Sequence, residues 1–167
     1  MEKESTNLQE YQLKDSTVVG QNFYSYGKLK YLSGKQVCEM GVYLNPGNDK
    51  FYKAINSEIY VDKTELIQYT NRVFNTMQQN VCVSRPRRFG KSYAAKMLAA
   101  YYSKGADSDS LFQNLKISKM DNYKENLNQY DVLFLDVAWF ISIASSIENT
   151  VSEMQDSIIE ELKSAFP

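Results

Sequence analysis

Histidine is missing from this sequence of 167 residues, and cysteine occurs only twice. Without histidine, a histidine-based catalytic triad is excluded, and Cys38 and Cys82 stand too far apart to form the Cys-x-x-Cys pair of a zinc site. No apolar run approaches the roughly 20 residues of a membrane helix. The polar residues at 1–5 do not lead into the apolar segment of a signal peptide. We therefore expect a cytoplasmic protein that does not bind membranes.

Charge of either sign is not in excess, because 19 Lys and Arg residues face 20 Asp and Glu residues and the net charge is −1. This balance gives no general reason to expect binding to nucleic acid or to a membrane surface. The densest basic cluster consists of Arg85, Arg87 and Arg88. Any binding of anions must therefore depend on this local patch, which we expect to face phosphate.

The stretch from Val81 to Ser92 joins a short apolar run, a basic loop and a Gly-Lys-Ser string at the start of a helical pattern. This is the layout of a phosphate-binding P-loop, G-x-x-x-x-G-K-[ST], with Arg85 in place of the first glycine. A tight loop before a helix supplies backbone N–H donors and the positive end of the helix dipole. We expect the phosphates of ATP to be bound by Arg87, Arg88, Phe89, Gly90, Lys91 and Ser92.

Two residues of this loop have separate predicted roles. Lys91 is expected to reach the β- and γ-phosphates, and the hydroxyl of Ser92 is expected to be a ligand for Mg²⁺. Pro86 has no N–H, so the backbone donors come from residues 87–92. The replacement of the first glycine by Arg85 is expected to reshape the loop rather than abolish binding. The alternative is a chance Gly-Lys-Ser string at a helix start.

The remaining pattern predicts an α/β fold. It indicates a buried strand at 81–84 that holds Cys82 as a structural thiol, a helix over 62–77 with Asp62 as its N-cap and Met77 on its inner face, and a helix after Lys91. Four apolar residues at 132–135 predict a strand buried on both faces. A last helix is expected after Ser145, with an inner face formed by Ile147, Val151, Met154, Ile158 and Leu162.

The order strand, helix, strand, helix around a P-loop predicts a P-loop NTPase-like, three-layer α/β/α fold. Two core strands are fewer than the about five or six of a typical sheet. We therefore expect an incomplete parallel sheet in a truncated chain. Residues 1–39 are expected to be a weakly ordered leader in which Val18 and Val19 could supply a short strand, and residues 40–167 the N-terminal part of the P-loop domain.

Hydrolysis of ATP also needs a carboxylate for the Mg²⁺ shell and a group that orients water. Asp136 follows the apolar run at 132–135 and therefore fits the form of a Walker B strand. The same pattern fits a sheet strand that simply ends in an acidic residue. Val137 follows Asp136 instead of a glutamate, so no catalytic base stands beside it.

Three strings resemble the bacterial AAA-ATPase-like family: residues 41–48 (GVYLNPGN), residues 60–64 (YVDKT) and residues 84–92 (SRPRRFGKS). The resemblance extends from about residue 40 to the end of the sequence. It implies an N-terminal P-loop NTPase domain, often followed by a PD-(D/E)xK-nuclease-like domain, with arginine usual at the position of Arg85. It also implies a later Walker B strand ending in Asp-Glu, so that Asp136 would end an earlier strand.

The expected function is that of the ATP-binding portion of such a protein, with ATP and Mg²⁺ as ligands and a nuclease-like domain as a partner in the full-length protein. Hydrolysis is expected to need the later Walker B strand, so that this fragment would be inactive alone. The alternative is a non-catalytic module that binds the phosphate backbone of DNA or RNA through the arginine loop, with strong salt dependence and no need for a nucleotide.

Overall fold

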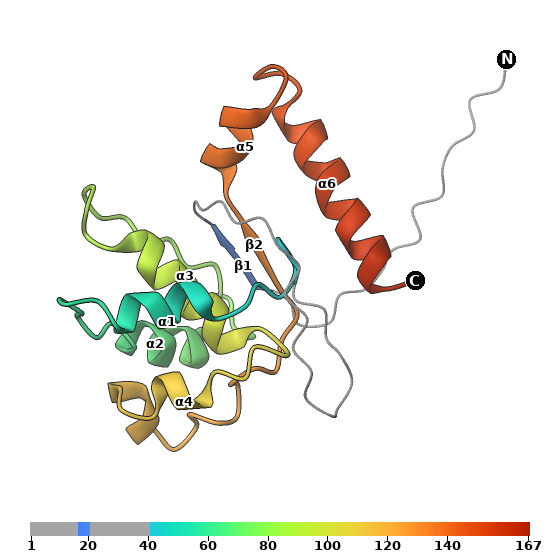
Figure 1. Ribbon diagram of the computed structural model, residues 1–167. Coiled ribbons are helices and arrows are strands. Elements are labelled where there is room, and N and C mark those ends of the chain that lie inside the picture. The colour runs from blue at the N-terminus through green and yellow to red at the C-terminus, as the bar shows by residue number, and fades with distance from the viewer. Residues whose placement is uncertain (1–16, 21–40) are drawn as a thin grey trace, which may run out of the picture.

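The computed structural model describes residues 17–20 and 41–167, which Figure 1 draws as coloured ribbon. Helices dominate this part of the chain and strands are few, so the protein is a mixed α/β chain. Its elements in order are β1 (Thr17–Gly20), α1 (Asp49–Ile55), α2 (Glu65–Val73), α3 (Lys91–Tyr102), α4 (Asp109–Phe112), the 3₁₀ helix η1 (Lys116–Lys119), β2 (Val132–Leu135), α5 (Val137–Ile143) and α6 (Thr150–Ala165). Apart from β1, the predicted leader lies outside the described residues.

β2 confirms the strand predicted at 132–135 and is hydrogen-bonded on both edges. On one edge it pairs in parallel with β1 along the full length of both strands. On the other edge, the N–H of Asn45 donates to the carbonyl of Val132 at 2.7 Å, and the N–H of Phe134 donates to the carbonyl of Tyr43 at 2.8 Å. A strand has only two edges for ladder hydrogen bonds, so β2 has no edge left for a further strand.

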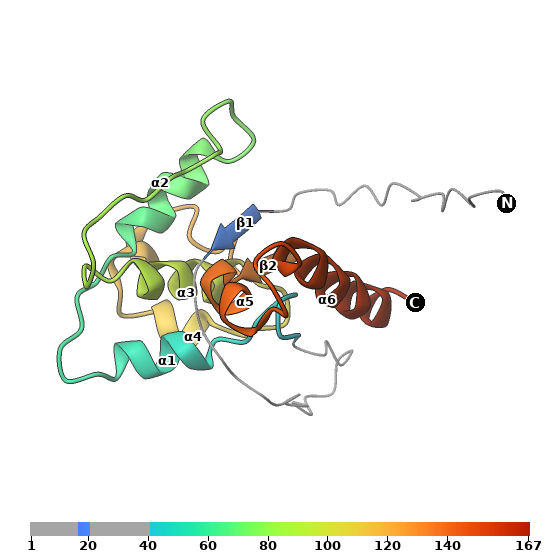
Figure 2. The same cartoon turned by 90° about the horizontal axis from the view of Figure 1, so that it is seen from above.

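α3 confirms the helix predicted after Lys91 and forms the buried centre of the helical part. Every residue from Ala94 to Tyr102 is buried, the pattern of a helix that is covered on all sides. Both strands and α1 pack against it, and α6 lies on the opposite side of the strands from α1 and α2 (Figures 1 and 2). Even the hydroxyl of Tyr101 is satisfied inside the core, because it donates to the carbonyl of Tyr123 at 2.6 Å.

The C-terminal end of α3 is closed by the side chain of Asn128. Its amide nitrogen donates to the carbonyls of Ala100 at 3.1 Å and Ser103 at 2.8 Å, and its amide oxygen accepts from the N–H of Ser108 at 2.9 Å. The last carbonyls of a helix have no partner within the helix and need such contacts when buried. The first turn of α3 is different, since Lys91 is half-buried and Tyr93 is 55% exposed.

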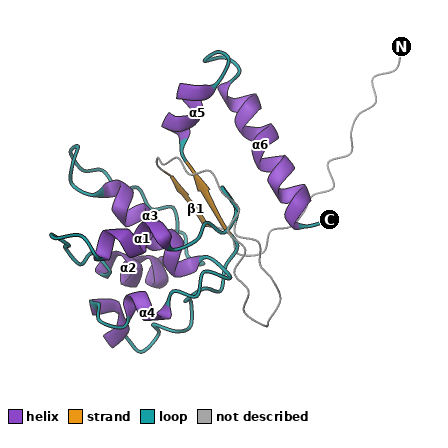
Figure 3. Ribbon diagram, in the orientation of Figure 1, coloured by secondary structure: helices purple, strands orange, loops and turns teal. Residues whose placement is uncertain are grey.

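The strand predicted at 81–84 does not form. This stretch belongs to the loop that joins α2 and α3 (Figure 3), and Val81 and Val83 are 38% and 44% exposed. Cys82 is an exposed free cysteine, so the prediction of a buried structural thiol was wrong. The physical reason is that β1 and the segment at 43–45 already occupy both edges of β2.

α2 is shorter than the helix predicted over 62–77. Phe74 leaves the helix with φ −58° and ψ 137°, and its ring centre lies 6.4 Å from that of Tyr102 and 4.9 Å from that of Tyr130. Asn75 follows with a φ of 56°, and Met77 is 95% exposed instead of buried. Aromatic packing at Phe74 therefore outweighs the helical periodicity that continues to Met77.

α6 confirms the predicted last helix but only part of its predicted inner face. Met154, Ile158 and Leu162 are half-buried, whereas Ile147 and Val151 are 78% and 58% exposed. An amphipathic pattern shows that a helix has an apolar face, but it does not show how much of that face a neighbour covers.

Lys96 is a charged residue within the buried helix α3. It is 9% exposed, and its Nζ lies 5.2 Å from the ring centre of Tyr93. Burial, and then the nearby positive charge of Lys50, lower the pKa of Lys96 to about 8. In the unfolded chain the pKa is about 10.4. Between these two values the unfolded state binds more protons, so stability rises with pH there and a constant penalty remains below about pH 8.

We expect Lys96→Met to raise the midpoint of thermal unfolding at about pH 7 by a few degrees, because the penalty for burying the ammonium is removed. The gain over the wild type should shrink as the pH rises from about 8 to about 10. Melting curves followed by circular dichroism across this range measure it, with the exposed Lys53→Met as the matched control. A midpoint for Lys96→Met at or below the wild-type value at neutral pH would contradict this account.

Candidate functional site

The loop before α3 presents residues 85–89 to solvent, and Gly90 is the N-cap of the helix. Gly90 has a φ of 75°, a left-handed conformation that glycine adopts without a steric cost. Arg88 has a φ of 71°, which costs a residue with a side chain about 1 to 2 kcal/mol. Backbone strain of this kind is concentrated at ligand sites. The loop therefore combines exposure, strain and a helix N-terminus.

Lys91 folds back over the loop that precedes it. Its Nζ donates to the carbonyl oxygen of Arg85 and lies 3.5 Å from the carbonyl oxygen of Pro86. The contact at position 85 is made by the backbone, and the Arg85 side chain is exposed and its φ is not positive. Position 85 therefore does not need glycine, which accounts for the arginine at the first glycine position of the motif.

A second lysine, Lys63, reaches the same loop from the segment before α2. Its Nζ donates to the carbonyl oxygen of Phe89 at 2.7 Å. A Cβ atom built on Gly90 would lie 2.4 Å from this Nζ, so the ammonium occupies the space that the missing side chain leaves open. The sequence reasoning did not assign Lys63 to the site. The available signal was its place in the YVDKT string that carries the family resemblance.

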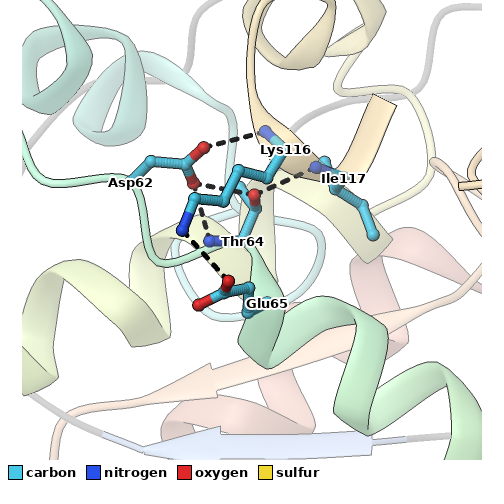
Figure 4. A network of polar contacts seen from close by, with 5 residues as sticks. All are labelled: Asp62, Thr64, Glu65, Lys116 and Ile117. Carbon is cyan, nitrogen blue, oxygen red and sulfur yellow. Dashed lines mark hydrogen bonds and ion pairs between the residues drawn. The ribbon is translucent and has the colours of Figure 1, made fainter. Parts of the chain in front are cut away.

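Asp62 and Thr64, on either side of Lys63, anchor this segment to η1 (Figure 4). One oxygen of Asp62 accepts from the N–H and the hydroxyl of Thr64 at 2.8 and 2.7 Å, and the other accepts from the N–H of Lys116 at 2.8 Å. The Thr64 hydroxyl oxygen also accepts from the N–H of Ile117 at 3.1 Å. Thr64, rather than the predicted Asp62, is the N-cap position of α2. The network fixes the backbone from which Lys63 extends.

The charge state of Asp62 agrees with these contacts. Burial raises the pKa of Asp62, but the hydrogen bonds from Lys116 and Thr64 outweigh it and hold the pKa below its ordinary value. The carboxylate is therefore ionised at neutral pH, and both of its oxygens are directed to neighbours other than Lys63.

A cavity of about 1020 Å³ lies between the loop and the segment that carries Lys63. One wall consists of residues 86–93 and includes all six residues predicted to bind phosphate. The other wall consists of Phe51, Ala54, Ser57, Ile59, Tyr60, Val61 and Lys63, and Ala94 and Met97 of α3 complete the lining. One wall is basic and has backbone donors, and the other is mostly apolar apart from the ammonium of Lys63.

Asp136 lies apart from this cavity. It is buried at 5% exposure at the end of β2, and one of its carboxylate oxygens accepts from the N–H of Trp139 at 2.9 Å as the N-cap of α5. It is not among the residues that line the cavity. In the part of the chain that the structure describes, no group of three or more Cys, Asp or Glu residues is placed to hold a metal ion. The metal-binding roles of Ser92 and Asp136 stay predictions.

Residues 47–166 match the protein-family model AAA-ATPase_like, described as predicted AAA-ATPase. The matched range covers well over half of the chain. The chain belongs to the AAA-ATPase-like family. No curated protein and no solved structure matches it.

In this AAA-ATPase-like chain, both walls of the cavity fall inside the matched range. The Lys63 segment and the loop before α3 are therefore parts of the same family domain. Among the helices at 41–167, none is both long enough and apolar enough to cross a membrane. The family assignment supports a nucleotide-using protein of the NTPase kind.

We expect Gly90→Ala to lower the free energy of unfolding by about 1 to 2 kcal/mol, because alanine resists a φ of 75°. Gly105→Ala is the matched control, since Gly105 follows the other end of α3 with the same φ of 75°. Only the Gly90 variant should also displace Lys63, whose Nζ the new Cβ would meet. Urea denaturation measures both losses, and an unchanged stability for Gly90→Ala would show that the left-handed N-cap is not present.

Proposed function

We propose that this chain is the ATP-binding portion of an AAA-ATPase-like protein, with the phosphates bound by residues 85–92. The observation that carries the proposal is the cavity at the N-terminus of α3, whose basic wall contains all six residues predicted from the motif. The volume of about 1020 Å³ is at the upper end of small-molecule sites. It leaves room for a base and a ribose beside a triphosphate.

The charges around the loop support an anionic ligand. Within 17–20 and 41–167, the ion pairs involve Lys104, Lys116 and Lys124 and none of the cations of the loop. Lys91 donates only to neutral carbonyl oxygens in the contacts given above. The 12-residue helix α3 adds its positive dipole end at Gly90. Phosphate oxygens would supply the negative charge that no ion pair among the described residues gives these cations.

The fit for Mg²⁺ rests on Ser92, which lies in the first turn of α3 and lines the cavity. Magnesium is usually bound by one or two protein oxygens together with the phosphates and water. Bound Mg²⁺ would neutralise phosphate charge. We propose that a carboxylate from a later strand of the family domain, in a three-layer α/β/α P-loop fold, completes hydrolysis, and that Asp136 does not.

We expect Lys91→Ala to weaken ATP binding about 100-fold, because a charge-assisted contact to the β- and γ-phosphates is lost. Titration calorimetry with Mg²⁺·ATP measures the affinity, and circular dichroism checks that the fold is retained. The exposed Lys53→Ala, on α1, is the matched control. Wild-type affinity in Lys91→Ala would contradict the assignment of the loop.

Asp136→Asn removes the charge of residue 136 and keeps an N-cap for α5. Asparagine is as good an N-cap as aspartate, so α5 should persist while the negative charge is removed. Because Asp136 does not line the cavity, we expect the affinity for Mg²⁺·ATP to change less than about twofold, a shift of under about 0.4 kcal/mol. The same calorimetric titration measures it. Robust ATP turnover that disappears in Asp136→Asn would instead identify Asp136 as the Walker B acid.

One observation favours a second candidate function. Arg85, Arg87 and Arg88 are all exposed on one loop, which suits a non-catalytic module that binds the phosphate backbone of DNA or RNA. Titration of single-stranded and double-stranded DNA at two salt concentrations, with and without ATP, separates the two functions. Salt-sensitive DNA binding without any ATP affinity would replace the ATP-binding proposal.

A further inference from the structure

The ammonium of Lys63 lies against the loop before α3, beside Phe89 and Gly90. We infer that Lys63 is a second phosphate-binding cation of this site, acting beside Lys91 on the same triphosphate. This inference rests on the proposed function, because it assigns a residue to the phosphate part of that ligand. Lys63 comes from the segment before α2, so the phosphates would be held between two separate parts of the chain.

The position of the Lys63 ammonium supports this role. The Nζ of Lys63 lies 2.7 Å from the carbonyl oxygen of Phe89, and it lies 2.4 Å from the place where a Cβ of Gly90 would be. In a P-loop, the absence of a side chain at the glycine before the lysine lets the phosphate approach the backbone. The ammonium of Lys63 is therefore in the space that a bound phosphate needs, and it lines the same cavity as Lys91 and Ser92.

The charge of Lys63 also supports this role. Lysine has three N–H donors and a full positive charge, and the contact given for Lys63 is to one neutral carbonyl oxygen. The neighbouring carboxylate of Asp62 is directed to Thr64 and to the backbone of Lys116. The ion pairs found among the described residues do not include Lys63. Its charge therefore faces the cavity, and among the described residues no carboxylate forms an ion pair with it, so an anion there is favoured.

The backbone around Lys63 is held in place by its neighbours. A long lysine side chain loses conformational entropy when it is fixed, so a binding lysine gains from a rigid backbone. Thr64 is fully buried. Its hydroxyl oxygen and a carboxylate oxygen of Asp62 accept hydrogen bonds from backbone N–H groups of η1 and so join the segment to it. When phosphate binds, Lys63 exchanges the Phe89 carbonyl for a phosphate oxygen with little movement of its backbone.

Substitutions at position 63 separate a phosphate contact from a role in holding the loop. Lys63→Gln keeps an N–H donor, on a side chain one atom shorter, but removes the charge, whereas Lys63→Arg keeps both a donor and the charge. The exposed Lys53→Gln on α1 is the control for a general change of charge. The ligands are Mg²⁺·ATP, inorganic tripolyphosphate, which has no base, and adenosine, which has no phosphate. Calorimetry on the full chain gives each affinity, and thermal melting checks the fold.

We expect Lys63→Gln to weaken ATP and tripolyphosphate about 10-fold and to leave adenosine binding and thermal stability unchanged. Lys63→Arg should return both affinities to within about threefold of the wild type. Wild-type affinities in Lys63→Gln, with ATP still lost in Lys91→Ala, would overturn the role of Lys63 and leave the proposed function intact. An equal loss for adenosine would make Lys63 a structural residue, and a wild-type protein that binds neither ATP nor tripolyphosphate would overturn both proposals.

Discussion

The burial of α3 from Ala94 to Tyr102 is the constraint on which the rest of the structure depends. From Ala94 to Tyr102 the helix has no exposed face, and Asn128 closes its C-terminal end. A helix packed on all sides can meet solvent only at a terminus, and here that terminus is the N-terminal one. Its unpaired N–H groups and positive dipole end therefore face the cavity. The position of the site follows from the packing of the core, before any side chain of the loop is considered.

The second wall of the cavity depends on a smaller set of contacts. Asp62 and Thr64 bind backbone N–H groups of η1, and α2 packs against the same short helix. In these contacts each polar group has a hydrogen-bond partner. They therefore fix the position of the segment more than they add to the free energy of unfolding. The consequence is that the residues on either side of Lys63 hold its backbone in place, while its own ammonium contacts the loop before α3 at the carbonyl oxygen of Phe89.

The parts predicted from the sequence are those that depend on local pattern. The run at 132–135 and the helix after Lys91 have strong signals within a few residues, and the structure forms both. The residues from Arg87 to Ser92 line one cavity, and their contact with phosphate stays a prediction. The stretch at 81–84 has an equally good strand pattern. Whether it pairs depends on which segments bind the two edges of β2, and the residues of the stretch itself do not determine this. Phe74 shows the same limit, since its aromatic partners lie far along the sequence.

Lys63 was missed for the same reason, because a contact over 26 residues cannot be read from spacing.

The converse case is Arg85, where the motif appeared broken. The first glycine of a P-loop is required only if that residue must adopt a positive φ or let a ligand approach closely. At position 85 φ is not positive, the residue is exposed and the backbone carbonyl accepts from Lys91, so the conformation of the loop does not require glycine there. Gly90 is the position that needs glycine, because its φ of 75° is one that residues with a side chain rarely adopt. An arginine at position 85 therefore adds positive charge to the loop without disturbing the geometry that a phosphate site needs.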